Sequence, residues 1–311
     1  MTTWGLAATI RAPAADILRF AAYHLDQGAH RLYIYLDDES PTAFKALKEH
    51  PKIRVQTCDE AYWKRLSGKR PEKHQVRQTL NATHAYNRRA EVDWLIHMDV
   101  DEFLVAQQPL TQVLDDLPSA VTSARVRPME LLGGSADAYK AFVPANGQRR
   151  KVVNQIYPRY GAHLTGGFLS HVAGKLFVRS GLNDMTFKIH NAFQGDTMLP
   201  NASELNQVDL AHCHAKSWED WRASFRYRHE RGSYRAELKP ASPPERGGLS
   251  LHDLFRKIEV EEGEAGLRAF YDEVIGDGPE LRARLSAHDL LRIVPLDCAT
   301  PIARHFPDAT F

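Results

Sequence analysis

The sequence predicts an α/β protein: a mainly parallel central sheet flanked by helices, with a helical C-terminal extension. Strand-like and helix-like segments alternate along the first third of the chain. Such alternation is typical of parallel strands joined by right-handed helical crossovers. Two of the expected strands end in acidic pairs, which places both pairs at the carboxyl edge of the sheet, where ligands bind. With 311 residues and 43% hydrophobic content, the chain can bury a sizeable core.

The elements follow from the spacing of apolar residues. Apolar and β-branched runs predict strands at 4–10, 31–36, 53–57 and 92–98. Helical spacing predicts helices at 14–27, 42–50 and 74–90. From about residue 109 the alternation stops, and strands are expected at 124–132 and 175–179 between glycine-rich loops. A basic amphipathic helix is expected at 218–237, a loop at 240–248, and helices over 249–292 with breaks near 263 and 276–279.

Composition excludes several classes of protein. The net charge of +1 provides no global attraction to nucleic acid or to a membrane surface. The three cysteines show no C-x-x-C spacing, which favours a reducing cytoplasm over a disulfide scaffold. The N-terminus has no basic segment followed by an apolar run, and no window approaches the roughly eighteen apolar residues of a membrane span. We expect a cytoplasmic protein with at most peripheral contact at the inner face of a membrane.

The stretch W-L-I-H-M-D-V-D-E-F-L, residues 94–104, places Asp99, Asp101 and Glu102 directly behind an apolar strand. A carboxylate pair on one side of a turn suits Mn²⁺ or Mg²⁺, which take oxygen ligands and share their shell with phosphates. An isolated D-x-D more often lies in a solvated loop, where one acid caps a turn. Here the motif shares a sheet edge with Asp37 and Asp38, and this favours a metal and a diphosphate.

The same stretch resembles the W-x-x-x-x-D-x-D-E-F-[LI] block of a glycosyltransferase family 2-like group whose relatives include the family 92 glycosyltransferases. Further blocks resemble the family in the same order: 22–28 with 33–40, Gln75 or Gln78 with Asn81, 174–179 with His190, and 210–217 with Arg231 and Gly232. Together the blocks cover about residues 4 to 235. The chain departs from the family at residues 11–13, where Arg-Ala-Pro replaces the usual Asn-Glu.

The resemblance implies a GT-A fold, a nucleotide-diphosphate sugar donor and a metal at the D-x-D motif. Asp99 and Asp101 would then reach the metal and the donor diphosphate or ribose. Asp37 or Asp38 would bind the nucleoside, and Gln78 would contribute to donor binding. Residues 1–108 would form the nucleotide-sugar half and 109–239 the acceptor-side half of one domain, followed by the extension at 240–311.

Later polar residues extend the expected site. His212 and His214 face the same way on an extended chain, so one of them could complete the metal shell, unless they are simply a histidine pair at a strand end. Lys216 and Lys175 are candidate counter-charges for the diphosphate, although Lys175 could equally be a solubilising lysine on an edge strand. Arg231, at the end of a basic run that otherwise predicts a solvated helix face, is assigned to the donor diphosphate.

An inverting transfer needs a general base to accept the proton of the acceptor hydroxyl. We expect Asp196 to be this base and Glu130 to be the second candidate; Asp184 and Glu204 are further carboxylates in the same region. A retaining mechanism would need no such base.

The sequence therefore predicts a metal-dependent glycosyltransferase. It would move a sugar from a nucleotide-diphosphate donor, with UDP-sugars favoured, to a hydroxyl of a glycan, lipid-linked or related acceptor. The alternatives are a sugar nucleotidyltransferase, which should carry a glycine-rich phosphate loop after the first strand, and a non-catalytic nucleotide- or glycan-binding module. No nucleic-acid partner is expected.

Overall fold

The structure, a computed structural model, describes residues 1–88, 91–201, 203–243, 245 and 248–309. It divides into two compact units. Unit 1 comprises Met1–Arg127, Ala173–Leu210 and Asp297–Phe311, and unit 2 comprises Pro128–Val172 and Ala211–Leu296. The predicted α/β class is confirmed, while the functional divisions after residues 108 and 239 stay predictions.

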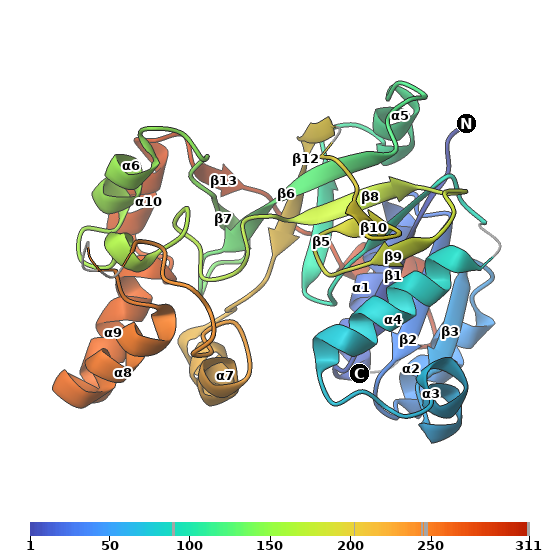
Figure 1. The fold of residues 1–311 in the computed structure, drawn as a ribbon, viewed down its shortest axis with the longest axis horizontal. Helices are drawn as coiled ribbons and strands as arrows, with labels where there is room; N and C mark the ends of the chain where they lie inside the picture. Colours follow the sequence, from blue (N-terminus) through green and yellow to red (C-terminus); the bar gives the residue numbers. More distant parts are fainter. Residues whose placement is uncertain (89–90, 202, 244, 246–247, 310–311) are drawn as a thin grey trace. The chain divides into compact units, whose positions relative to one another are not determined.

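Unit 1 is built on the predicted parallel sheet (Figure 1). Its strands are β1 (Trp4–Ile10), β2 (Arg31–Leu36), β3 (Ile53–Thr57), β4 (Trp94–His97) and β8 (Lys175–Arg179). They lie in the order β8-β4-β1-β2-β3, and all neighbouring pairs are parallel except β4 with β8. All seven residues of β1 are buried, as expected for a strand that is covered on both faces.

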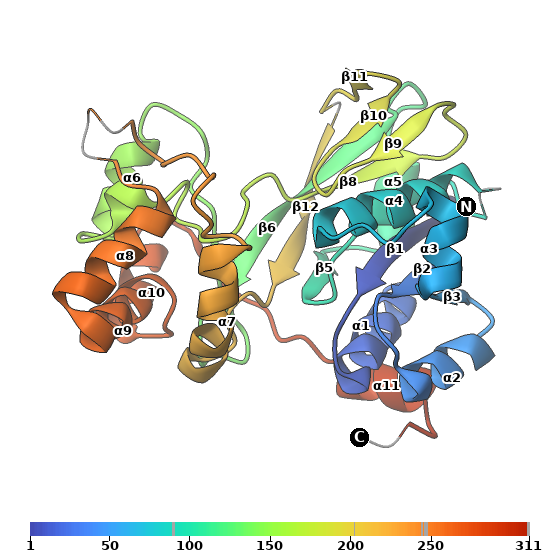
Figure 2. The same cartoon turned by 60° about the horizontal axis from the view of Figure 1, so that its bottom comes forward.

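Helices cover the two faces of this sheet (Figures 1 and 2). The helices of unit 1 are α1 (Ala14–Asp26), α2 (Pro41–Glu49), α3 (Glu60–Ser67), α4 (His74–Asn87), α5 (Leu110–Asp115) and α11 (Ala299–His305). One face packs on α1, α2, α5 and the end of α11, and the other packs on α3, α4 and a small antiparallel sheet. The C-terminal residues therefore return to complete the first core.

Individual residues explain where the helices begin and how closely neighbouring strands approach each other. Gly5 in β1 lies so close to β2 that a Cβ atom there would stand 2.5 Å from the Arg31 carbonyl oxygen. Pro41 occupies the first turn of α2, where its missing N–H has no helical acceptor to lose. The Asp59 carboxylate accepts a hydrogen bond from the Tyr62 amide and caps α3.

Several elements of unit 1 were not predicted. They are α3, β5 (Glu102–Ala106), α5, α11, and the sheet of β9 (Met185–Phe187), β10 (Ala192–Gln194) and β11 (Thr197–Met198). None of them exceeds eight residues. Short elements carry too few periods of an apolar pattern to stand out from loop sequence. The strand β12 (Ser203–His212) has ten residues and was not predicted either, because polar residues interrupt its apolar pattern. The predicted helix at 74–90 ends earlier, at Asn87.

Unit 2 combines a short antiparallel sheet with helices. β6 (Ser123–Leu131) and β12 (Ser203–His212) continue into it from unit 1, and β6 pairs there with β7 (Ala138–Ala141), which pairs with β13 (Leu291–Ile293). Its helices are α6 (Arg149–Ile156), the 3₁₀ turn η1 (Gly161–His163), α7 (Trp218–Glu230), α8 (Leu251–Glu261), α9 (Gly263–Val274) and α10 (Pro279–Ser286). Aromatic side chains from α7, α8 and α9 form much of its core.

Two sequence predictions for unit 2 are corrected. The expected helix at 218–237 ends at Glu230, and Gly232 follows with a backbone so close to Arg228 that a Cβ atom would clash with it. The expected helical stretch 249–292 finishes in the strand β13, because Leu291, Arg292 and Ile293 pair with β7. The breaks expected near Gly263 and Pro279 are confirmed.

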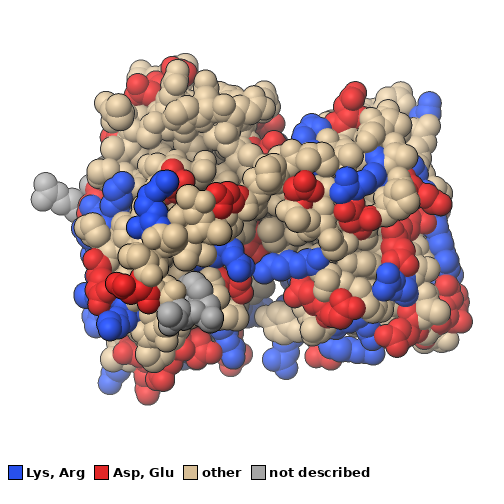
Figure 3. Space-filling model, turned by 180° about the vertical axis from the view of Figure 1, so that it is seen from behind, with Lys and Arg blue, Asp and Glu red and all other residues tan. Residues whose placement is uncertain are grey.

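Among the described residues, no helix is both long enough and apolar enough to cross a membrane. Seen from behind, basic and acidic side chains are interspersed over the surface (Figure 3). This distribution agrees with the net charge of +1.

Candidate functional site

The two acidic strand ends lie on one edge of the sheet of unit 1. β2 is followed by Asp37 and β4 by Met98 and Asp99, and β1 lies between these two parallel strands. Two strand spacings separate them by roughly 10 Å. The expectation that both acidic ends share the carboxyl edge is confirmed.

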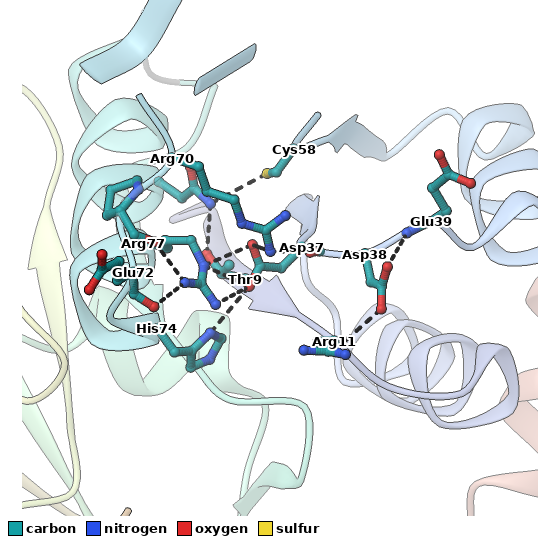
Figure 4. Close-up of polar contacts among 12 residues, drawn as sticks. Thr9, Arg11, Asp37, Asp38, Glu39, Cys58, Arg70, Glu72, His74 and Arg77 are labelled. Carbon is teal, nitrogen blue, oxygen red and sulfur yellow. Dashed lines mark hydrogen bonds and ion pairs between the residues drawn. The ribbon is translucent and has the colours of Figure 1, made fainter. Parts of the chain in front are cut away.

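Asp37 is a buried anchor for basic side chains (Figure 4). Arg77 Nε and Nη2 each lie 2.8 Å from Asp37 Oδ2, and Arg70 Nη2 lies 3.0 Å from Oδ1. His74 Nδ1 lies 3.4 Å from Oδ2. Burial alone would raise the pKa of Asp37, but the hydrogen bonds from His74 and Arg77 and the arginine charges outweigh it and lower the pKa. Asp37 is therefore ionised and fully occupied within the fold.

Asp38 faces solvent beside a cavity. Its carboxylate lies 3.2 Å from Arg11 Nε, and both side chains are well exposed (Figure 4). The cavity has a volume of about 240 Å³ and is lined by Ile10, Arg11, Ala12, Ile17, Asp38, Glu39 and Ser40. Its lining combines apolar side chains with hydrogen-bond donors and acceptors. Of the two candidates Asp37 and Asp38, only Asp38 lines this cavity.

Asp99 is held by donors from two other elements. Lys175 Nζ on β8 lies 2.6 Å from Asp99 Oδ2, and Gln78 Nε2 on α4 donates to Asp99 Oδ1. The same ammonium lies 3.2 Å from Glu102 Oε2, which also accepts the Asp99 backbone N–H at 2.9 Å. Burial alone would lower the pKa of Lys175, but the charges of Asp99 and Glu102 raise it. The group is a charged lysine that is bound to two carboxylates.

Lys175 is not a solubilising residue on an edge strand, so that alternative is wrong. β8 pairs with β4 on one side and with β6 on the other, and the Lys175 side chain has no exposed surface. Its role as a diphosphate counter-charge stays a prediction.

Lys175 and Gln78 each bind one oxygen of Asp99, and its role as a metal ligand stays a prediction. Asp101 lies half-buried in the turn between β4 and β5. Across the parts of the chain that the structure describes, no cluster of three or more His, Cys, Asp and Glu side chains has the arrangement of a metal site. A metal shell made from protein groups alone is therefore not assembled by these residues.

Glu130, the second candidate base, lies buried in unit 2. Its Oε1 accepts the Ser170 N–H at 2.8 Å, and its Oε2 lies 3.3 Å from Lys140 Nζ. Burial would raise the pKa of Glu130, but Lys140 and the bonds from Ser170 lower it. Lys140 also donates to the Val274 carbonyl oxygen at 2.7 Å. These contacts join four segments of unit 2, namely β6, β7, the loop at Ser170 and α9.

The later polar candidates also belong to unit 2. The rings of His212 and His214 lie 5.1 Å apart, and His214 Nε2 lies 3.2 Å from the Tyr234 hydroxyl. Lys216 is exposed just before α7, and Arg231 follows the end of that helix. The structure thus brings the two histidines together, and the assignment of all four residues to the metal or diphosphate stays a prediction.

Asp196 belongs to unit 1. It lies exposed in the tight turn between β10 and β11. The neighbouring Gly195 amide donates to the Asp184 carbonyl oxygen at 2.9 Å, which ties this turn to the residue before β9. The carboxylate is accessible, and its role as the base stays a prediction.

Residues 9–238 match the model of glycosyltransferase family 92. The chain belongs to this family. The resemblance expected from the motif blocks is thus confirmed, and membership of a glycosyltransferase family supports the predicted class of enzyme. No curated protein sequence matches the chain significantly.

Solved structures show a distant likeness to this family 92 member. HddC from Yersinia pseudotuberculosis has 11% identity and a TM-score of 0.36, covering 73% of this chain and 99% of that one. The galactosyltransferase LgtC in complex with donor and acceptor sugar analogues has 12% identity and a TM-score of 0.28, covering 56% and 57%. A mycobacterial protein has 12% identity and a TM-score of 0.32, covering 60% and 57%. The chain thus spans little more than half the length of the last two.

Sequence reasoning missed the basic side chains around Asp37. Arg70, His74 and Arg77 lie in the segment K-R-P-E-K-H-Q-V-R, residues 69–77. Its density of basic residues just before a predicted helix was an available signal. What the sequence could not give is that this helix begins beside the end of β2, because that placement depends on packing.

Proposed function

We propose that this family 92 member transfers a sugar from a nucleotide-diphosphate donor to a hydroxyl of a glycan, lipid-linked or related acceptor. The observation that carries the proposal is the arrangement at one sheet edge. A cavity with Arg11 and Asp38 lies at the ends of β1 and β2, and the D-x-D motif follows β4. A separation of roughly 10 Å suits a donor whose nucleoside lies at the end of β2 and whose diphosphate extends from there toward the D-x-D motif.

The donor end is assigned from the contacts. Asp38 can accept a hydrogen bond from a ribose hydroxyl or a base N–H, and Arg11 can donate to a base carbonyl or to phosphate. UDP-sugars are the favoured donors in this proposal. Asp37 does not touch the donor; it holds Arg70, Arg77 and His74 at the same edge, where the two arginines provide positive charge for phosphate oxygens.

A divalent cation, Mn²⁺ or Mg²⁺, when bound, would neutralise charge on the leaving diphosphate. Asp101 is the residue that would hold it together with the donor's own phosphates. Asp99 positions the motif through its bonds to Lys175 and Gln78.

On the acceptor side, Asp196 would remove the hydroxyl proton as the sugar transfers with inversion. Glu130 is the weaker candidate, because its carboxylate is buried and committed to Ser170 and Lys140. Lys216 and Arg231 would add positive charge for the diphosphate, and His212 or His214 would complete the metal shell. A cytoplasmic location, with at most peripheral membrane contact, belongs to the same proposal.

The test is a thermal-shift panel of UDP-, GDP-, CMP- and dTDP-sugars, each with and without Mn²⁺. A ligand at a hundred times its dissociation constant stabilises the folded state by about 2.7 kcal/mol. We expect one nucleotide class to stabilise the wild type, with a loss of the shift in Asp38→Ala and of its Mn²⁺ dependence in Asp101→Ala. Glu60→Ala, an exposed acid on α3, is the matched control and should keep the shift.

Release of nucleoside diphosphate in the presence of acceptor sugars then separates an enzyme from a binding module. If no nucleotide stabilises the protein with or without metal, the proposed donor site is wrong. If a nucleotide binds but no acceptor is ever glycosylated, the non-catalytic alternative holds.

A further inference from the structure

The carboxylates that follow β4 are paired with a buried lysine from β8. The Lys175 ammonium lies 2.6 Å from Asp99 Oδ2 and 3.2 Å from Glu102 Oε2, between two carboxylates that belong to the D-x-D-E stretch. The Lys175 side chain has no exposed surface and that of Glu102 is 6% exposed. A charge buried this completely is retained in a fold only when it is paired.

The ammonium is held in place by the sheet. Val126 of β6 pairs with Lys175, and Phe177, two residues further along β8, pairs with Ile96 of β4. Both neighbours of β8 thus fix the backbone from which the lysine extends. The carboxylates are fixed as well, since Gln78 donates to Asp99 and the Asp99 amide donates to Glu102.

We propose that Lys175 is a resident cation of the D-x-D site, occupying the place between Asp99 and Glu102 in which a divalent metal would otherwise bind. Lys175 is then a positioning residue, and Asp99 is not a metal ligand. A divalent cation reaches this edge of the sheet only with a nucleotide diphosphate that supplies the missing oxygen ligands.

The inference rests on the proposed donor site but is tested without any nucleotide, so the two can fail separately. The measurement is titration with Mn²⁺ alone, followed by loss of the electron paramagnetic resonance signal of the free ion. The variants are Lys175→Met, which keeps an unbranched side chain without charge, and Asp99→Asn. Lys140→Met is the matched control, because Lys140 is also a fully buried lysine but pairs with one carboxylate, Glu130.

We expect Lys175→Met to bind Mn²⁺ at least tenfold more tightly than the wild type and to gain thermal stability from it, because two carboxylates lose their counter-charge. Lys140→Met should show no such gain. Asp99→Asn should leave any weak Mn²⁺ binding that the wild type shows at other sites unchanged within a factor of two.

Two results would overturn the proposal. One is a folded Lys175→Met protein, verified by circular dichroism, that gains no Mn²⁺ affinity over the Lys140→Met control. The other is a tenfold or greater loss of wild-type Mn²⁺ affinity in Asp99→Asn, which would make Asp99 a direct ligand. Mn²⁺ binding by the nucleotide-free wild type that is lost in Asp99→Asn would overturn the proposal even if Lys175→Met does not fold.

Discussion

Asp37→Asn should strongly destabilise the protein, although it changes a single atom. Asn keeps the volume and one acceptor oxygen but removes the charge that faces Arg77 and Arg70. The Asp37 side chain has no exposed surface and that of Arg77 is 10% exposed, so the lost attraction is not replaced by water. Removing one partner of a buried ion pair typically costs 3–5 kcal/mol.

The structure places the expected loss at the lower end of that range, about 3 kcal/mol. Arg70 is 46% exposed and can be solvated after the change. Arg77 keeps two carbonyl acceptors, Pro71 and Glu72, at 2.8 and 2.7 Å through Nη1. These contacts reduce the expected loss of stability but do not remove it.

The neighbouring residue provides the control. Asp38→Asn removes a carboxylate whose partner Arg11 is 71% exposed, and exposed pairs contribute 0–1 kcal/mol. Urea unfolding at pH 7 measures both variants. Equal losses in Asp37→Asn and Asp38→Asn would refute the assignment of Asp37 as a buried anchor. In the double variant Asp37→Asn with Arg77→Met, part of the loss should be recovered, because the unpaired charge is also removed.

Three further outcomes follow from other parts of the structure. Asp196→Asn should lower kcat by about 10²–10⁴-fold and leave the free energy of unfolding unchanged. Glu130→Gln should lower the free energy of unfolding by about 3–5 kcal/mol and keep its kcat when folded. The opposite pair of results would make Glu130 the base and Asp196 the structural residue. Burial lowers the pKa of His24 to about 4, so its stabilising effect is complete above about pH 6.5 and is lost as the pH falls toward 4. That loss is about 3 kcal/mol, and urea unfolding of His24→Phe should lack this part of the pH dependence. Phe306→Ala should cost about 3–5 kcal/mol because the ring joins the core of unit 1, while Ile293→Ala, 53% exposed, should stay near the wild type in a thermal melt.

The first parallel strands could be predicted because each is a continuous apolar run followed by a polar stop. β2, for example, reads R-L-Y-I-Y-L and ends at Asp37. Short elements such as β11, with two residues, carry no such pattern. They form because a partner strand supplies their hydrogen bonds, and a partner cannot be seen from local sequence.

In the candidate site, too, some residues could be predicted from the sequence and others could not. The acidic residues at the strand ends were visible, because a carboxylate after an apolar run is unusual. The side chains that bind these carboxylates could not be predicted. Lys175 lies 76 residues after Asp99, and only the antiparallel pairing of β8 with β4 brings the two side chains together. Long-range pairing of this kind depends on the register of the sheet, which no local pattern encodes.

One helix couples the two acidic ends. His74, Arg77, Gln78 and Asn81 of α4 have the spacing that places side chains on one helix face. The first two approach Asp37 and the third binds Asp99, while Asn81 donates to Thr9 of β1 at 3.0 Å. The distance between the two ends is therefore fixed by a rigid element rather than by loops.

The carboxylate clusters at the ends of β2 and β4 also differ in net charge. Asp37 is one carboxylate facing two guanidinium groups, from Arg70 and Arg77. At the end of β4, the single ammonium of Lys175 is bound by two carboxylates, and Asp101 adds another. The cluster around Asp37 alone thus carries a net positive charge, while Asp38 and Glu39 follow it along the chain, and the cluster at the end of β4 carries a net negative charge. An anionic diphosphate that brings a divalent cation would meet both, with its phosphates toward the arginines and the cation toward Asp101. A neutral sugar alone would satisfy neither end, and this supports a nucleotide-diphosphate sugar as the donor.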